Sequence, residues 1–177
     1  RHFRNVTLDK INVVYCAASA CFRETDKEKA RRTVAARFGV TGDFLLFVGN
    51  MNVHKNIPTL IKVFAACRAR HPALNMVICG KRNSSYSALQ GLAQGLGIQK
   101  GVIFIDDADD DAHVLLYNAA RLFVFLSLYE GFGMPPLEAM SCGTPVVAST
   151  MTSIPEVLSD AACLVDPQDE NGVTQAI

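Results

Sequence analysis

The stretch Ser127 to Ser149, SLYEGFGMPPLEAMSCGTPVVAS, decides the fold that we predict for this chain. The apolar run before it, Leu122–Leu126, is short and β-rich, as expected of a buried strand. Glycines on both sides of Phe132 predict a sharp turn. Two prolines then open a helix, because proline is tolerated where the amide hydrogen has no helical partner. A glycine and a further proline end this helix, and Val146–Ala148 form the next strand.

Two carboxylates frame this turn. Glu130 lies in the loop and Glu138 lies one turn into the helix. The backbone amides of Gly131 to Met134 are expected to point outward beside the helix N-terminus, where they favour an anion such as a diphosphate. Glu138 could accept hydrogen bonds from a diol such as a ribose, and Glu130 could hold sugar hydroxyls or steady a developing positive charge. Together these features predict a nucleotide sugar as the ligand.

The segment EGFGMPPLEAMSCGTPVVAS resembles the Glu-x7-Glu motif of the group 1 glycosyltransferases, which are retaining enzymes with the GT-B fold. LLFVGNMNVHKN (Leu45 to Asn56) is similar to the family's first strand and phosphate-binding loop. SIPEVLSDAACLVDP (Ser153 to Pro167) is similar to the segment that follows the glutamate pair. Because several motifs occur in the family's order, the resemblance is specific, and it extends from Ile11 to the C-terminus.

The resemblance implies a donor-binding domain that helps to move a hexose from a nucleoside diphosphate sugar to an acceptor hydroxyl, with retained anomeric configuration. Catalysis is implied for Lys55, which would stabilise the leaving diphosphate together with the loop amides, and for Glu130, which would hold the donor sugar. Glu138 would hold the ribose, and the backbone near Ala108 would touch the base. The donor-binding residues implied are Gly49, Asn50, Lys55, Ala108, Glu130, Gly131, Phe132, Gly133, Met134, Leu137 and Glu138.

Simpler interpretations exist for each of these charged residues. Lys55 could be a solvated loop lysine, Glu130 an exposed loop acid, and Glu138 a carboxylate that only caps its helix. None of the three explains the glycine loop between the glutamates. Where the family commonly has arginine after the glycine, this chain has Asn50, so phosphate neutralisation is expected to depend more on Lys55 and the loop amides.

The remaining apolar runs alternate with helical segments. Expected strands cover 11–15, 44–48, 75–79, 102–105 and the neighbourhood of Leu164; expected helices cover 27–38, 58–69, 86–96, 109–120, a turn from Pro155 and a segment from Gln168. Strands that are apolar on both faces indicate a parallel sheet covered on both sides. The predicted fold class is therefore α/β, a doubly wound, Rossmann-like parallel sheet corresponding to the C-terminal half of a GT-B fold, with ligands at the carboxyl ends of the strands.

The composition of the chain argues against several classes of protein. The 177 residues suit one domain, 1–177, and a net charge of zero gives no basic surplus for nucleic acid. No apolar run is long enough to span a bilayer, so we expect a cytoplasmic protein. The six cysteines and four histidines show no ligand spacing, which argues against a zinc site or a disulfide scaffold. Four cysteines are expected to be small core residues: Cys67, Cys79, Cys142 and Cys163.

An aspartate run, Asp106 to Asp111, contains the Asp-x-Asp pattern that binds metal in the other large glycosyltransferase fold. Aspartates between a strand and a helix are more often turn and cap residues, and GT-B members generally work without a bound metal. No metal or other cofactor is therefore expected. Paired carboxylates also occur in glycoside hydrolases, but one loop acid and one helix acid suit holding a ligand better than proton transfer.

The chain begins with Arg1 and stops at Ile177 inside an expected helix. We therefore expect a fragment that lacks an N-terminal acceptor domain and is inactive alone. That other domain would receive an acceptor saccharide or lipid-linked saccharide and would make any peripheral membrane contact. Two alternatives stay open: a stand-alone nucleotide-binding module without catalysis, and a nucleotide-sugar epimerase of the same fold.

Overall fold

A computed structural model describes residue 7, residues 10–106 and residues 108–177. Within these residues, six strands form one sheet in the order β3-β2-β1-β4-β5-β6, and every neighbouring pair is parallel. The strands are β1 (Phe44–Val48), β2 (Asn75–Cys79), β3 (Val102–Ile105), β4 (Leu122–Phe125), β5 (Val146–Ser149) and β6 (Cys163–Val165). The order reverses direction between β1 and β4, as in a doubly wound sheet.

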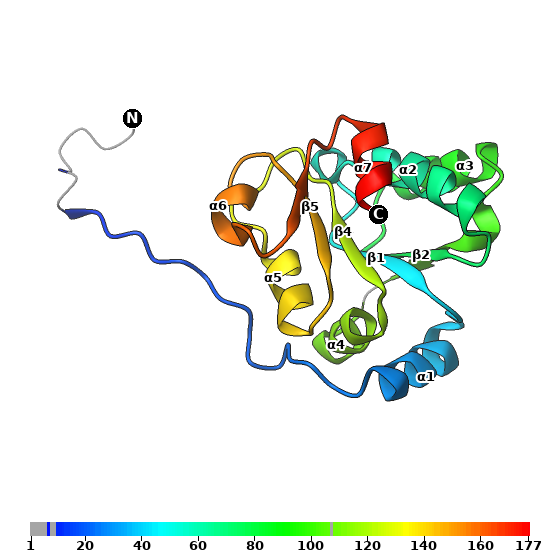
Figure 1. Cartoon of the computed structure of the whole chain (residues 1–177), viewed down its shortest axis with the longest axis horizontal. Helices are drawn as coiled ribbons and strands as arrows, with labels where there is room; N and C mark the ends of the chain where they lie inside the picture. Colours follow the sequence, from blue (N-terminus) through cyan, green and yellow to red (C-terminus); the bar gives the residue numbers. More distant parts are fainter. Residues whose placement is uncertain (1–6, 8–9, 107) are drawn as a thin grey trace.

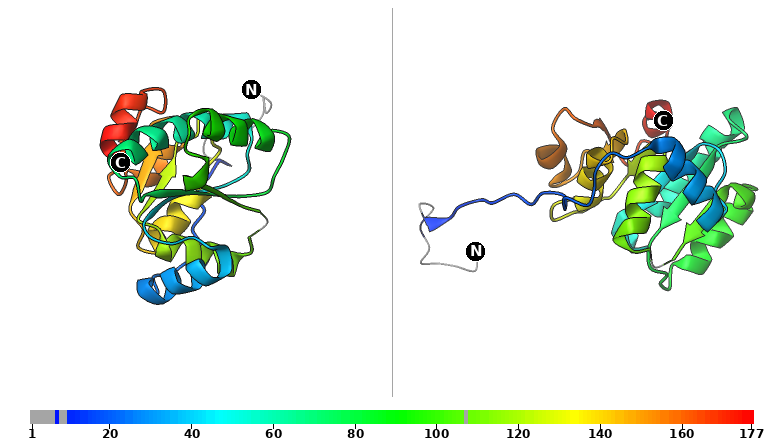
Figure 2. Two further views of the ribbon diagram at one scale, coloured as in Figure 1. Left: turned by 90° about the vertical axis from the view of Figure 1, so that its right-hand side faces the viewer. Right: turned by 90° about the horizontal axis from the view of Figure 1, so that it is seen from below.

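Helices cover both faces of this sheet. They are α1 (Lys27–Phe38), α2 (Ile57–Arg70), α3 (Tyr86–Gly95), α4 (Asp110–Ala119), α5 (Met134–Ser141), α6 (Ile154–Leu158) and α7 (Glu170–Ala176), with the short 3₁₀ helices η2 (Val53–Lys55) and η3 (Gln99–Gly101). Figures 1 and 2 show α2, α3 and α7 on one face and α1 and α4 on the other. The predicted doubly wound, Rossmann-like architecture is confirmed.

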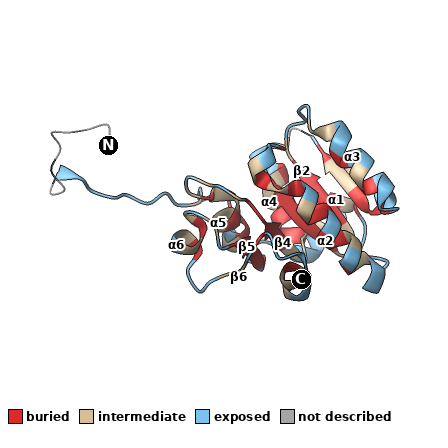
Figure 3. Ribbon diagram, turned by 90° about the horizontal axis from the view of Figure 1, so that it is seen from above, coloured by how far each residue is buried: buried red, intermediate tan, exposed pale blue. Residues whose placement is uncertain are grey.

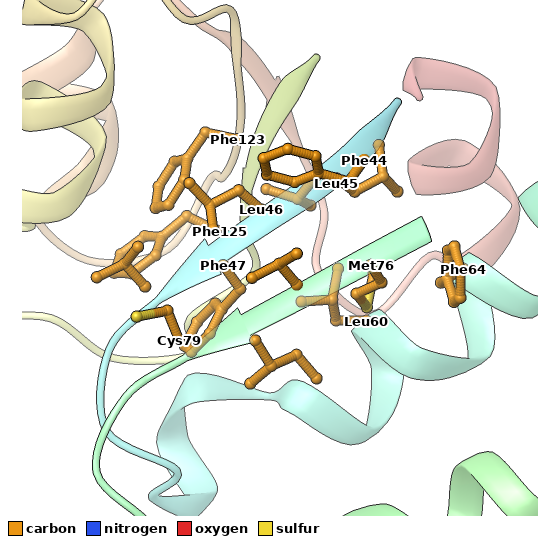
Figure 4. Packing of buried hydrophobic residues seen from close by; sticks show 14 of the residues in the cluster. Phe44, Leu45, Leu46, Phe47, Leu60, Phe64, Met76, Cys79, Phe123 and Phe125 are labelled. Carbon is orange, nitrogen blue, oxygen red and sulfur yellow. The ribbon is translucent and has the colours of Figure 1, made fainter. Parts of the chain in front are cut away.

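The core lies between the sheet and these helices. All five residues of β1 are buried, and the central strands are the most continuously buried part of the molecule (Figure 3). Phe47 of β1 stacks on Phe125 of β4 with ring centroids 6.2 Å apart, and Leu60 and Phe64 of α2 pack beside β1 and β2 (Figure 4). Each fully buried side chain of this kind contributes about 1.5–3 kcal/mol, so both faces of the strands must be apolar.

Aspartate side chains cap two of the helices. Asp26 caps α1 by accepting from the amide of Lys29 at 3.0 Å. Asp109 caps α4 by accepting from the amide of Ala112 at 2.8 Å. Side-chain oxygens at this position satisfy amides that have no partner inside the helix, which fixes where each helix begins.

Two predictions are wrong. Residues 11–15 pair with no strand of the described sheet. They are extended and exposed, with Val14 87% accessible, and the segment projects away from the domain (Figure 1). An apolar run becomes a strand only where a neighbour takes its backbone hydrogen bonds. Cys163 is exposed on the edge strand β6 rather than buried. The last helix, which was expected from about Gln168, is present and begins at Glu170, because Asp169 caps it.

Candidate functional site

The candidate site lies where the strand order reverses, at the carboxyl ends of β1 and β4. The loop after β1 leads from Gly49 to η2, and the loop after β4 leads from Leu126 to α5. The amide of Leu128 donates to the carbonyl oxygen of His54 at 2.8 Å, which ties the two loops together. In doubly wound sheets, ligands bind in the crevice at this reversal.

Lys55 and Glu130 meet where these two loops come together. Lys55 Nζ donates to Glu130 Oε1 at 2.5 Å, and the two side chains are only 10% and 12% exposed. The ammonium also lies 5.2 Å from the centre of the Phe125 ring. The interpretations as a solvated lysine and an exposed loop acid are therefore wrong. Because an ammonium has three donors, Lys55 can hold Glu130 and still donate to an anion.

Hydrogen bonds from the segment after β5 hold the glycine loop. The amide of Glu130 donates to Thr152 Oγ1 at 3.0 Å. Ser153 Oγ lies 3.1 Å from the carbonyl oxygen of Glu130 and 3.2 Å from that of Phe132. Gly133 has φ 97° at the cap of α5, a conformation that residues with a Cβ rarely adopt. The turn that the sequence predicted is thus built by glycine and by two hydroxyls.

Glu138 lies deeper than a capping residue would. Since α5 begins at Met134, Glu138 is past the first turn, and its Oε2 accepts from the hydroxyl of Tyr117 at 2.9 Å. Burial raises the pKa of the Glu138 carboxyl; the hydrogen bond from Tyr117 and the nearby His113 lower it, and Asp110 raises it. The capping interpretation is wrong: Glu138 is a half-buried acid held by a side chain of α4.

Our sequence interpretation missed Tyr117 and Thr152 as site residues. A tyrosine inside an otherwise apolar helical run was the available signal for Tyr117, because a buried phenol needs a hydrogen-bond partner. Nothing local distinguishes Thr152, whose role depends on the loop that lies against it. Phe125, which lies beneath the Lys55 ammonium, was recognised only as part of a strand.

In the described part of the chain, the other predicted residues make no hydrogen bond to Lys55 or Glu130. Asn50 is exposed, and its Oδ1 accepts from the amide of Asn52 at 3.3 Å. Ala108, Met134 and Leu137 are each partly buried. The structure therefore brings Lys55 and Glu130 together directly, whereas the role expected for Asn50 and Ala108 stays a prediction.

Two of the aspartates that follow β3 make local contacts. Asp106 accepts from the amide of Arg82 at 3.1 Å and pairs with its Nε at 3.4 Å, and Asp109 caps α4. Asp107, the first aspartate of the Asp-x-Asp pattern, lies outside the described residues. Among those that are described, no cluster of three or more His, Cys, Asp or Glu side chains could hold a metal ion.

No helix in the described ranges has the length and apolar character needed to cross a membrane.

Known proteins resemble this chain in both sequence and fold. O-antigen chain mannosyltransferase B of Escherichia coli is 39% identical over 139 residues, which cover 76% of this chain and 35% of that protein. O-antigen chain mannosyltransferase RfbU of Salmonella typhimurium is 32% identical over 174 residues, which cover 98% of this chain and 45% of that protein. The chain thus spans less than half the length of these relatives.

Two solved structures show the same fold. Sucrose-phosphate synthase from Thermosynechococcus elongatus superposes with a TM-score of 0.77 at 26% identity, covering 90% of this chain and 41% of that one. Anabaena HepE in complex with UDP and glucose superposes with a TM-score of 0.81 at 22% identity, covering 93% and 45%. The sequence model of the family described as "Glycosyl transferases group 1" matches residues 30–177. The chain therefore belongs to the group 1 glycosyltransferases, and its sheet is the Rossmann-like domain of their GT-B fold.

Proposed function

We propose that this chain is the donor-binding domain of a retaining glycosyltransferase, which moves a hexose from a nucleoside diphosphate sugar to an acceptor hydroxyl. The observation that carries the proposal is the contact between Lys55 and Glu130 at the point where the strand order reverses. In this proposal the cation, the carboxylate and the N-terminal amides of α5 face a single ligand. The cation and the helix N-terminus suit a diphosphate, and the carboxylate suits the hydroxyls of a sugar.

Each group has a distinct role in this proposal. The ammonium of Lys55 and the amides of Gly131 to Met134 stabilise the charge of the departing diphosphate, an electrostatic contribution that grows where water is excluded. Glu130 binds hydroxyls of the donor sugar while it positions Lys55. Glu138 accepts hydrogen bonds from the ribose. The family commonly has an arginine where this chain has Asn50, so a larger share of the phosphate charge falls on Lys55.

Mannose is the sugar that we propose, and an O-antigen-like polysaccharide is the product. Support comes from the two O-antigen mannosyltransferases that the chain resembles. The acceptor, a saccharide or lipid-linked saccharide, would bind to an N-terminal domain outside these 177 residues, and any peripheral membrane contact would be made there. All six cysteines are free, which suits a reducing compartment such as the cytoplasm.

Calorimetric titration with UDP, GDP and ADP tests the donor site. We expect one nucleotide to bind, and Lys55→Ala to weaken it by roughly ten- to a hundredfold, because a hydrogen bond to a charged group contributes about 1.5–3 kcal/mol. Glu138→Ala should weaken it as well. Lys62→Ala is the matched control: Lys62 pairs with Glu170 at 3.1 Å with both side chains 48% exposed, and it lies on α2.

The same titration tests the expectation that no metal takes part. Affinity should be equal in EDTA and in magnesium chloride. If no nucleotide binds at millimolar concentration, or if Lys62→Ala weakens binding as much as Lys55→Ala, the donor-site proposal is wrong. Binding that requires magnesium would contradict the metal-independent version of it.

A further inference from the structure

Tyr117 is held in one orientation by the core. Its side chain is fully buried, and its ring packs edge-on against Phe22 and Phe123, with centroids 5.9 Å and 5.4 Å away and interplanar angles of 73° and 68°. Thr144 Oγ1 donates to the Tyr117 backbone carbonyl at 2.6 Å. The two aromatic neighbours fix the plane of the ring, and the direction of the hydroxyl follows from that plane.

That hydroxyl points at the acid proposed to bind ribose. It donates to Glu138 Oε2 at 2.9 Å, and within the described ranges no second side chain or amide donates to this carboxylate. One oxygen is thus held by the protein, and Oε1 retains its full capacity to accept. A carboxylate has about four acceptor sites, so a diol can bind to a group whose rotation is already restricted.

The hydrogen bond from Tyr117 affects the ionisation of the Glu138 carboxyl. Burial raises the pKa of the Glu138 carboxyl; the hydrogen bond from Tyr117 and the nearby His113 lower it, and Asp110 raises it. Burial raises the pKa of the nearby Cys142 thiol to about 11, which keeps that thiol protonated. Tyr117 therefore favours the ionised form, which accepts hydrogen bonds from two hydroxyls.

We propose that Tyr117 is the positioning residue for ribose recognition: it orients Glu138 through its hydroxyl and contacts no part of the ligand itself. This inference rests on the function proposed above, because it assumes that Glu138 accepts the ribose hydroxyls.

Tyr117→Phe tests the inference, since it removes the hydroxyl and keeps the ring that packs in the core. We expect affinity for the nucleotide that binds among UDP, GDP and ADP to fall about tenfold. Affinity for its 2′,3′-dideoxy counterpart should not change. In a Glu138→Ala background, Tyr117→Phe should have no further effect on either ligand.

The pH dependence gives a second readout. Nucleotide affinity should decline as the pH falls through the pKa of Glu138, because protonation removes an acceptor. Without the Tyr117 hydroxyl this pKa lies higher, so Tyr117→Phe should lose affinity at a higher pH than the unaltered chain. Thr144→Val is the matched control: it removes a buried hydrogen bond to the same residue and leaves the contact with Glu138 in place, so neither affinity nor its pH midpoint should move.

Phe22→Leu extends the test in case Tyr117→Phe does not fold. It loosens the ring without removing the hydroxyl, and it should weaken the ribonucleotide but not the dideoxy compound. The inference is overturned if Tyr117→Phe weakens both compounds equally, if Thr144→Val has the same effect, or if the loss persists in the Glu138→Ala background. If the unaltered chain binds no nucleotide, the proposed function fails and this inference fails with it.

Discussion

Lys55 and Glu130 carry opposite charges at a place where water reaches little of either side chain. Taking two charges out of water costs free energy that their attraction only partly offsets, so such a pair need not stabilise the fold. Removing one partner is different, because the other charge is then left without compensation. The pair is best understood as a functional arrangement that the core tolerates.

Glu130→Ala should accordingly lower the free energy of unfolding by about 1–3 kcal/mol, measured by urea denaturation. The double variant Lys55→Met, Glu130→Leu should recover most of that loss, because it removes both charges together. Glu170→Ala is the matched control: it removes the acid of the exposed pair with Lys62 and should cost about 0–1 kcal/mol. Equal losses for Glu130→Ala and Glu170→Ala would contradict this account.

Glu138 should make the fold less stable at neutral pH than it is with an uncharged residue at this position. The pKa of its carboxyl is raised in the folded chain, chiefly by burial, so the folded state binds its proton at a higher pH than the unfolded state does. The stability linked to this group is present below the unfolded pKa and is lost as the pH rises through the folded pKa.

Glu138→Gln keeps an acceptor for Tyr117 and removes the ionisation. We expect the glutamine variant to be more stable than the unaltered chain at neutral pH, and the difference to shrink as the pH is lowered through the pKa of Glu138. Urea denaturation of both proteins at a series of pH values measures this. A difference that grows on acidification would show that burial does not dominate the environment of Glu138.

At the scale of elements, the strand ends approach each other closely beside the site. Gly49 donates its amide to the carbonyl oxygen of Cys79, and Gly80 donates to that of Ile105. A Cβ on Gly80 would lie 1.9 Å from the carbonyl oxygen of Gly49. The ends of β1 and β2 therefore come together only because no side chain stands between them.

Two glycine-to-alanine substitutions should change the stability of the fold in opposite directions. Gly80→Ala forces backbone to move at the end of β1 and should cost about 1–3 kcal/mol of stability. Gly91→Ala, inside α3 with nothing within 4 Å of the added carbon, should instead stabilise the chain by about 0.5–1 kcal/mol. Thermal unfolding of both variants checks the pair; a stabilising Gly80→Ala would mean that the strand ends are loosely packed.

At the scale of the whole molecule, the sheet was largely predictable and the contacts between its loops were not. The strands 44–48, 75–79 and 102–105 were predicted to the residue, because each is a local apolar run bounded by polar residues or glycine. The turn at residues 130–133 was predicted because glycine and proline constrain the backbone locally. By contrast, residues 11–15 have the sequence pattern of a strand but no partner strand. The pattern does not reveal whether a partner strand lies beside the segment.

The candidate site was predicted as a set of residues but not as a structure. Motif resemblance selected Lys55, Glu130 and Glu138. That Lys55 bonds to Glu130, and Glu138 to Tyr117, depends on β4 lying beside β1 and on α4 packing against α5. Those placements follow from the topology of the complete sheet, which no stretch of sequence encodes by itself.

The contact between Lys55 and Glu130 also bears on folding. The two residues are 75 positions apart, and they lie in the segments that follow β1 and β4, the two strands at the reversal in strand order. Contacts at such sequence separation form only after a large loop has closed, which slows folding. A chain in which only β1 to β3 have formed therefore contains half a site. A ligand that binds only when both halves are formed raises the free energy of unfolding of the entire sheet. It therefore slows hydrogen exchange at the backbone amides of β1 and β4 together, and not only in one loop.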